Sequence, residues 1–233
     1  MSIEKAKKVG LFGAILLAIS CFIPFAGSIK MLISSPQIFN KPAGGILNIE
    51  HSMSSISFYL IEIIGFILVL MGVGPIAMAV RRDDIKKELS AGVVIYAIVI
   101  GLLIFFSFVI LPNPVFAFSA NILVLFIIVI ILFIFVTMLI PVSLIELGNA
   151  LRSIFFKVSG VLLLILMLTL MYAITLTFSF YLSAKGAPTH VPLSSNLDQY
   201  LTYLGFLSAY FFLILGFNNI KLTPSKLDEL ISP

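Results

Sequence analysis

Six long apolar runs, separated by short polar segments, dominate this sequence. They lie at about 9–29, 55–80, 90–111, 121–145, 158–183 and 199–220. A helix needs about 20 apolar residues, at about 1.5 Å rise each, to cross a hydrocarbon core of about 30 Å. Each run is long enough for one crossing. The sequence therefore predicts an all-α membrane protein, a bundle of six transmembrane helices.

Composition favours one membrane domain over a membrane anchor with a soluble domain. Of the 233 residues, 61% are hydrophobic and 10% are charged, whereas a soluble domain carries about 25% charged residues. The six runs use roughly 140 residues, which leaves too few for a separate soluble core. We expect a single polytopic domain over 1–233. The net charge of +4 is spread over short segments, so nucleic acid is not an expected partner.

The basic residues alternate with the apolar runs and so predict an orientation. Eleven of the fourteen Lys and Arg residues fall on one side of a six-span bundle. These are Lys5, Lys7, Lys8, Arg81, Arg82, Lys86, Lys87, Arg152, Lys157, Lys221 and Lys226. The other three are Lys30, Lys41 and Lys185. Because positive loops stay in the cytoplasm, we expect both termini to be cytoplasmic, in a multi-pass plasma-membrane protein.

The two inner linkers are short and charged. In the linker around 81–88, Asp83 and Lys87 are four residues apart and can pair if this segment is helical. The linker at about 146–157 mixes large apolar residues with Arg152 and Lys157. That pattern fits a helix lying at the membrane interface. It fits equally well the overlapping ends of two long helices.

No catalytic, cofactor-binding or metal-binding motif is present in the sequence. There is no H-E-x-x-H, C-x-x-C or G-x-S-x-G pattern. His51 and His190 both fall in predicted outer loops and could approach Glu50 and Asp198 as a metal site. Nothing in their spacing requires it, and ordinary loop histidines are the simpler interpretation. We therefore predict no catalytic residue, cofactor or metal.

Glu62 is the clearest acidic residue inside a predicted span. It lies seven residues after the start of the run at 55–80, about 10 Å below the outer surface. At that depth we expect protonation or a polar partner. Thr175 and Tyr203 have comparable depth on two later runs, and Cys21 does on the first. Glu62 is either a proton- or cation-linked site or a hydrogen-bonding contact between helices, and both interpretations remain open.

Small residues recur at intervals of four on two of the runs. Gly10, Ala14 and Ala18 form such a stripe on the first, and Gly205 and Ala209 on the last. These stripes allow close helix contact within the bundle, with a second copy or with another protein. The segment Met71–Gly72–Val73–Gly74–Pro75 predicts a break or a kink in its helix.

Three stretches resemble an uncharacterised family of archaeal multi-pass membrane proteins, a domain of unknown function. They are Glu-Lys-Ala-Lys-Lys-Val-Gly-Leu-Phe-Gly-Ala-Ile-Leu-Leu at 4–17, Ile-Gly-Phe-Ile-Leu-Val-Leu-Met-Gly-Val at 64–73 and Phe-Phe-Lys-Val-Ser-Gly-Val-Leu-Leu-Leu-Ile at 155–165. Together they cover about a sixth of the chain. The resemblance implies an archaeal plasma membrane and no catalytic residue.

These observations lead to one preferred function and one alternative. Few intramembrane polar groups and short loops favour a non-enzymatic accessory or scaffolding subunit of a membrane complex, with a respiratory or other energy-converting complex as one host. Its partners would then be the lipid bilayer and other integral membrane subunits. The alternative is a small proton- or cation-coupled transporter that uses Glu62. An intramembrane enzyme ranks third because the sequence contains no paired catalytic residues.

Overall fold

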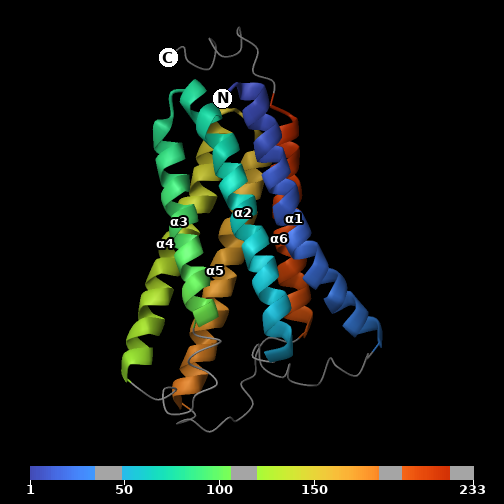
Figure 1. Cartoon of the computed structure of the whole chain (residues 1–233), viewed down its shortest axis with the longest axis vertical. Coiled ribbons are helices and arrows are strands. Elements are labelled where there is room, and N and C mark those ends of the chain that lie inside the picture. The colour runs from blue at the N-terminus through green and yellow to red at the C-terminus, as the bar shows by residue number, and fades with distance from the viewer. Residues whose placement is uncertain (35–48, 106–119, 184–195, 221–233) are drawn as a thin grey trace.

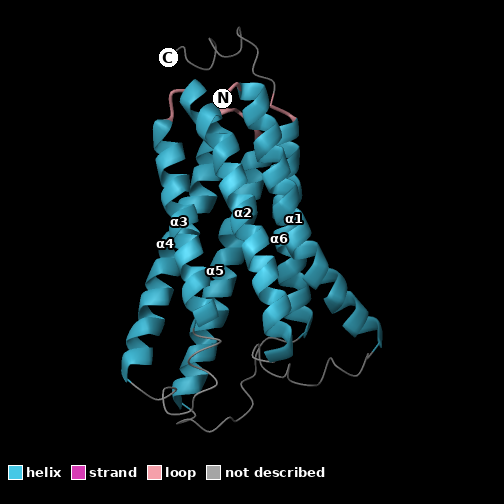
Figure 2. Cartoon of the chain, viewed as in Figure 1, coloured by secondary structure: helices cyan, strands magenta, loops and turns pink. Residues whose placement is uncertain are grey.

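The computed structural model of this chain describes residues 1–34, 49–105, 120–183 and 196–220. These residues form α-helices joined by short turns, with no strand in any of the four ranges (Figure 2). The helices are α1 (Ile3–Ser34), α2 (Ile49–Ala79), α3 (Asp83–Phe105), α4 (Ala120–Ala150), α5 (Ile154–Ser183) and α6 (Asn196–Asn218). The predicted all-α fold is therefore confirmed.

Four of these helices contain segments long and apolar enough to cross a membrane. The segments are Tyr59–Ala79 in α2, Ile127–Ala150 in α4, Ile154–Tyr172 in α5 and Leu201–Asn218 in α6. This finding concerns length and composition within the described residues. Helices α1, α2, α4 and α5 have 30 to 32 residues each, longer than the apolar runs that predicted them. A helix of 30 residues extends about 45 Å, which is enough to pass through both the hydrocarbon core and its polar borders.

The helices form a closed ring in chain order. Each helix packs against its neighbours in the sequence, and α6 also packs against α1. Successive helices run in opposite directions (Figure 1). The start of α1, the α2–α3 and α4–α5 turns and the end of α6 therefore lie at one end of the bundle. We call this end the charged end, because nine Lys and Arg residues among the described residues lie there.

Helices α1 and α2 make the most extensive contact in the ring, and glycines permit it. A Cβ atom placed on Gly72 of α2 would lie 2.5 Å from the Cα of Gly10 on α1. One placed on Gly13 of α1 would lie 2.7 Å from the carbonyl oxygen of Gly65 on α2. Side chains at these positions would hold the two backbones apart, as expected for close packing of transmembrane helices.

Both tight turns at the charged end place an arginine in the left-handed conformation. Arg81 has φ 55° and Arg152 has φ 51°. The following amides close the helix ends, with Arg82 N donating to the Ala77 carbonyl at 2.9 Å and Ser153 N to the Gly148 carbonyl at 2.8 Å. This is the hydrogen-bond pattern of a Schellman helix end. The linker at 146–157 is thus a turn between two long helices, and the alternative of a separate interfacial helix is wrong.

Prolines do not divide the helices. Helix α2 continues through Pro75, and α4 continues through Pro141. A break at 71–75 is therefore excluded, and a kink there stays a prediction. The glycines of that segment serve packing: Gly72 meets α1, and Gly74 faces the aliphatic part of Lys86, 3.5 Å from an added Cβ. A glycine that sequence alone associates with flexibility is explained here by the close approach of another element.

Aromatic and aliphatic side chains fill the centre of the ring. The largest fully buried side chains include Tyr210, Phe66, Phe156 and Phe217. Phe156 of α5 meets Phe217 of α6 edge-on, with ring centroids 5.2 Å apart. Large apolar side chains also cover the outside, including Phe12, Ile67, Val94, Ile165 and Phe211. An outer surface of this kind suits a lipid environment, where apolar groups need not be hidden from water.

Candidate functional site around Glu62

Glu62 lies near the middle of α2 rather than close to its N-terminal end. The sequence placed the start of this span at residue 55, but the helix begins at Ile49. The difference arises because the first helical turns contain Glu50, His51 and several serines, which read as a polar loop in the sequence. Glu62 is thus 13 residues from the start of its helix, about 20 Å along the axis.

Two tyrosines from other helices hold the Glu62 carboxylate. The hydroxyl of Tyr210, on α6, donates a hydrogen bond to Glu62 Oε1 at 3.0 Å. The Tyr96 hydroxyl, on α3, donates a second one. Both tyrosines are buried. The carboxylate therefore links α2, α3 and α6 across the centre of the ring, and the two phenols replace the water that a buried polar group would lose.

Aromatic packing fixes the positions of the two phenol groups. Phe66 lies one helical turn after Glu62 on the same face of α2. Its ring meets Tyr96 edge-on at a centroid distance of 5.2 Å and Tyr210 at 6.2 Å. Phe206 packs against Tyr210 from within α6, also at 6.2 Å. Such edge-to-face pairs add to the burial of the rings themselves, so the hydroxyls are held in place before they bond the carboxylate.

Three further ionisable side chains lie close enough to Glu62 to interact with it electrostatically. They are Cys21 of α1, Tyr59 of α2 and Tyr203 of α6. Cys21 is buried, and the Ser20 hydroxyl beside it donates to the Leu17 carbonyl at 2.7 Å. We call Glu62, Tyr96, Tyr210, Cys21, Tyr59 and Tyr203 the Glu62 cluster.

The structure brings together some of the predicted site residues and adds others. Tyr203 belongs to the Glu62 cluster, but the hydrogen bond comes from Tyr210, seven residues further along the same face. Both Glu62 and Tyr210 are further from the starts of their helices than from the starts of the apolar runs, since α2 begins at Ile49 and α6 at Asn196. Tyr96 was not predicted, although its position inside an apolar run was a usable signal. Thr175 lies in α5, and its side chain is outside the described residues.

The predicted small-residue contacts fall inside the bundle. A Cβ on Gly10 would meet the ring of Phe217 on α6, and one on Gly205 would meet the side chain of Leu166 on α5. Ala14 and Ala209 are completely buried. Ala18 is partly buried and borders a groove between α1 and α6 on the outer surface.

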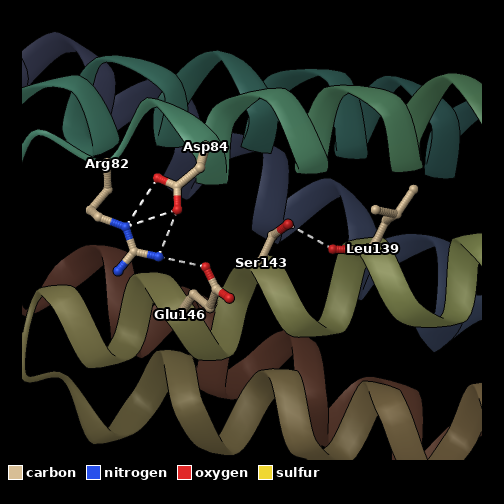
Figure 3. A network of polar contacts seen from close by, with 5 residues as sticks. All are labelled: Arg82, Asp84, Leu139, Ser143 and Glu146. Atoms are coloured by element: carbon tan, nitrogen blue, oxygen red, sulfur yellow. Dashed lines mark hydrogen bonds and ion pairs between the residues drawn. The ribbon is translucent and has the colours of Figure 1, made fainter.

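A second polar network joins two helices at the charged end (Figure 3). Arg82, in the α2–α3 turn, approaches Asp84 at 2.8 Å and Glu146 of α4 at 2.7 Å. The hydrogen bond from Arg82 lowers the pKa of Asp84 below its ordinary value. Desolvation, followed by the nearby charges of Glu146 and Asp84, raises the pKa of Glu88. The expected Asp83–Lys87 pair is absent among the described residues, where the ion pairs are those of Arg82 with Asp84 and Glu146.

The N-terminal segment is tied to the end of α6 at the same level. Lys7 Nζ donates to the Ile220 carbonyl at 3.2 Å. A cation at a helix C-terminus satisfies a free carbonyl and complements the helix dipole. This contact helps to close the ring between α1 and α6.

A metal site formed by the two histidines stays a hypothesis from the sequence. The side chains of His51 and His190 lie outside the described residues. Within the described residues, no group of three His, Cys, Asp or Glu side chains could hold a metal ion. The Glu62 cluster itself contains one carboxylate, a thiol and phenols. The chemistry that the structure shows there is hydrogen bonding between side chains of three helices.

Comparison with models of protein families, with curated proteins and with solved structures finds no match. The resemblance of 4–17, 64–73 and 155–165 to an archaeal family therefore stays a prediction from the sequence.

Proposed function

We propose that all six helices span the plasma membrane, with both termini and the two tight turns in the cytoplasm. Four helices have the required length and apolarity, and α1 and α3 complete the same ring. The concentration of lysine and arginine at the charged end supports this orientation. An archaeal membrane agrees with the sequence resemblance.

Cysteine labelling tests this topology. In a Cys21→Ala background, Ser153→Cys in the α4–α5 turn should resist a membrane-impermeant thiol reagent in intact cells. Ala187→Cys, in a predicted outer loop, should react. The opposite pattern would invert the orientation, and reaction at both sites would contradict the span count.

Within this membrane, we propose that the chain is a non-enzymatic accessory or scaffolding subunit of a larger membrane complex. The observation that carries this proposal is the way in which the Glu62 cluster is satisfied internally. Tyr96 and Tyr210 supply the hydrogen bonds of the carboxylate, and buried aromatic rings pack around them. This arrangement favours a structural link between three helices. A respiratory or other energy-converting complex is one candidate host.

Mass spectrometry of the protein extracted gently from its native membrane tests the subunit proposal. Stoichiometric partners should co-purify, and the Glu62→Gln variant should still assemble with them, since the amide oxygen can accept from either tyrosine. Purification of the chain alone, or as a homo-oligomer, would contradict the proposal.

A second candidate is a small proton- or cation-coupled transporter. The observation that favours it is the presence of several ionisable groups around Glu62, with Cys21 and Tyr203 close by. An intramembrane carboxyl commonly marks a proton or ion pathway. This candidate predicts that Glu62→Gln abolishes uptake in proteoliposomes, with Tyr172→Phe, an exposed tyrosine of α5, as the control. Uptake that survives Glu62→Gln would eliminate it.

A further inference from the structure

An amphiphilic groove opens on the outer surface at the charged end, beside the α2–α3 turn. It has a volume of about 620 Å³. Its polar part is lined by Asp83, Lys86, Lys87 and Ser90 of α3. Its apolar part is lined by Ala91, Val94 and Ile95 of α3 and by Met78 of α2. We call this the α2–α3 groove.

The polar and apolar parts of the groove are arranged in order along α3. The helix begins at Asp83 in the turn and runs toward the opposite end of the bundle. Lys86 and Lys87 lie in its first two turns, and Val94 lies seven residues beyond Lys87, about 10 Å along the axis. Val94 is 57% exposed, and Met78 is 46% exposed. A ligand lying in this groove would meet cationic groups first and an apolar surface below them.

The two lysines are available to a ligand. Both are exposed, and the ion pairs among the described residues connect Arg82 with Asp84 and Glu146 instead. The aliphatic part of Lys86 lies over Gly74, where the missing side chain leaves room for it. Asp83 is the one carboxylate that lines the groove, so two positive charges face a single negative one.

We propose that the α2–α3 groove binds one anionic phospholipid from the cytoplasmic leaflet. Lys86 and Lys87 bind the headgroup phosphate, and one acyl chain lies along Val94 and Ile95. The charge of the two lysines selects an anionic over a zwitterionic lipid, since a lysine near the membrane surface favours anionic lipid. The proposal rests on the membrane location and orientation proposed above, and it holds for either a subunit or a transporter.

Quenching of a single tryptophan by brominated lipids tests this site. The sequence contains no tryptophan, so Val94→Trp introduces the only indole, at an exposed position in the groove. The full chain is reconstituted in phosphatidylcholine vesicles that contain a small fraction of one lipid brominated in its acyl chains. That lipid is either phosphatidylglycerol or phosphatidylcholine.

The control reporter is Phe211→Trp. Phe211 is 56% exposed and lines a groove between α1 and α6 whose lining residues carry no charge. Both substitutions are on the outer surface, and thermal midpoints show whether each variant retains the fold. The Lys86→Gln/Lys87→Gln double variant is then combined with Val94→Trp.

At Val94→Trp we expect brominated phosphatidylglycerol to bind about tenfold more tightly than brominated phosphatidylcholine, from the charge of two lysines opposed by Asp83. The preference should be lost in the lysine double variant and absent at Phe211→Trp. Equal quenching by the two lipids at Val94→Trp, or a preference that survives the double variant, would overturn the proposal. If neither reporter is quenched by any brominated lipid, the membrane location itself is wrong.

Discussion

Two polar networks cross-link helices in this bundle, and they differ in their access to water. In the Glu62 cluster, a carboxylate in mid-bundle accepts hydrogen bonds from two buried tyrosines on two other helices. At the charged end, Glu146 of α4 and Asp84 of α3 share one arginine, whose side chain is 40% exposed. The first network is surrounded by aromatic rings, and the second is partly solvated.

This difference decides how much each network contributes to stability. A polar group without a partner in an apolar interior loses its hydrogen bonds to water and gains no others, which destabilises the folded state. A surface ion pair that is broken regains water, so its net contribution is small and falls with salt. We therefore expect substitutions that remove a single polar atom to destabilise the protein more in the middle of the bundle than at the charged end.

The largest contrast should come from two glycines on the same helix. Gly72→Ala places a methyl group 2.5 Å from the Gly10 backbone, which should separate α1 from α2 and lower the free energy of unfolding by about 2 kcal/mol. Gly74→Ala meets only the flexible side chain of Lys86, at 3.5 Å, and should be neutral or stabilising by up to about 1 kcal/mol. Unfolding in detergent micelles measures both. Equal effects at the two positions would refute the close α1–α2 contact.

The tyrosine hydroxyls should show coupling through Glu62. Tyr96→Phe and Tyr210→Phe each remove one donor and should lower the free energy of unfolding by about 1–2 kcal/mol. The double variant leaves the carboxylate with neither donor, so its loss should exceed the sum of the single losses. Tyr172→Phe, with its side chain 67% exposed, is the matched control and should have no effect. Strict additivity would show that the two hydroxyls do not share the carboxylate.

Replacing an arginine with glycine should stabilise the turns at the charged end. Arg81 and Arg152 have positive φ angles, and an L-residue with a side chain pays a conformational penalty there that glycine avoids. Arg81→Gly should raise the free energy of unfolding by about 1 kcal/mol. Arg82→Gly is the control, since it lacks this conformation and should not stabilise. A loss of stability in Arg81→Gly would contradict the turn geometry.

Removing the arginine of the surface network should have a smaller effect that depends on salt. Arg82→Ala breaks the pairs with Asp84 and Glu146 and should lower the free energy of unfolding by about 0.5 kcal/mol at low ionic strength. The loss should disappear in about 1 M salt, where the screening length is about 3 Å. A loss of stability that persists at high salt would show that this network is shielded from solvent, as the Glu62 cluster is.

The smallest effect concerns the pH dependence at Glu88. Its pKa lies above the ordinary value of 4.5, because of desolvation and the charges of Glu146 and Asp84. The folded state thus holds this proton more tightly, and the resulting stability is present below pH 4.5 and is lost as the pH rises through the raised pKa. Glu88→Gln should therefore be slightly more stable than the parent at neutral pH, with no difference below the ordinary pKa.

Asp84 should respond to pH in the opposite direction. Its pKa is lowered by Arg82, so its contribution is present above the ordinary value of 3.8 and is lost as the pH falls through the lowered pKa. Thermal midpoints of Glu88→Gln and Asp84→Asn, measured across this range, separate the two. A destabilised Glu88→Gln at neutral pH would contradict the assigned electrostatics.

Much of the fold follows from local pattern, but the ends of its helices do not. Apolar runs predicted six helices, and each described helix covers the middle of one run. Helix α2 nevertheless starts at Ile49, within a segment of Glu, His and Ser that reads as a loop. Polar residues can continue a helix once its apolar part is anchored, because propensity differences are small per residue. Glu62 is therefore 13 residues into its helix rather than seven residues into its apolar run, and the residue of α6 that bonds it is Tyr210.

Glycine roles were equally dependent on neighbours. Gly72 and Gly74 occur two residues apart before a proline, a local pattern that indicates a break. In the folded chain one of them meets the backbone of α1 and the other meets a lysine side chain. No local rule distinguishes these two positions, since the difference comes from which helix lies opposite.

The sequence by itself determined the helical class, the six apolar segments and the gathering of positive charge at one end, because hydropathy and charge act residue by residue. The tertiary structure alone decided which polar groups meet: Glu62 with Tyr96 and Tyr210, Arg82 with Glu146, and Lys86 and Lys87 with the apolar residues of the α2–α3 groove. These contacts join residues far apart in the chain. Their formation depends on the rotation and depth of each helix, which are set by packing against all of its neighbours.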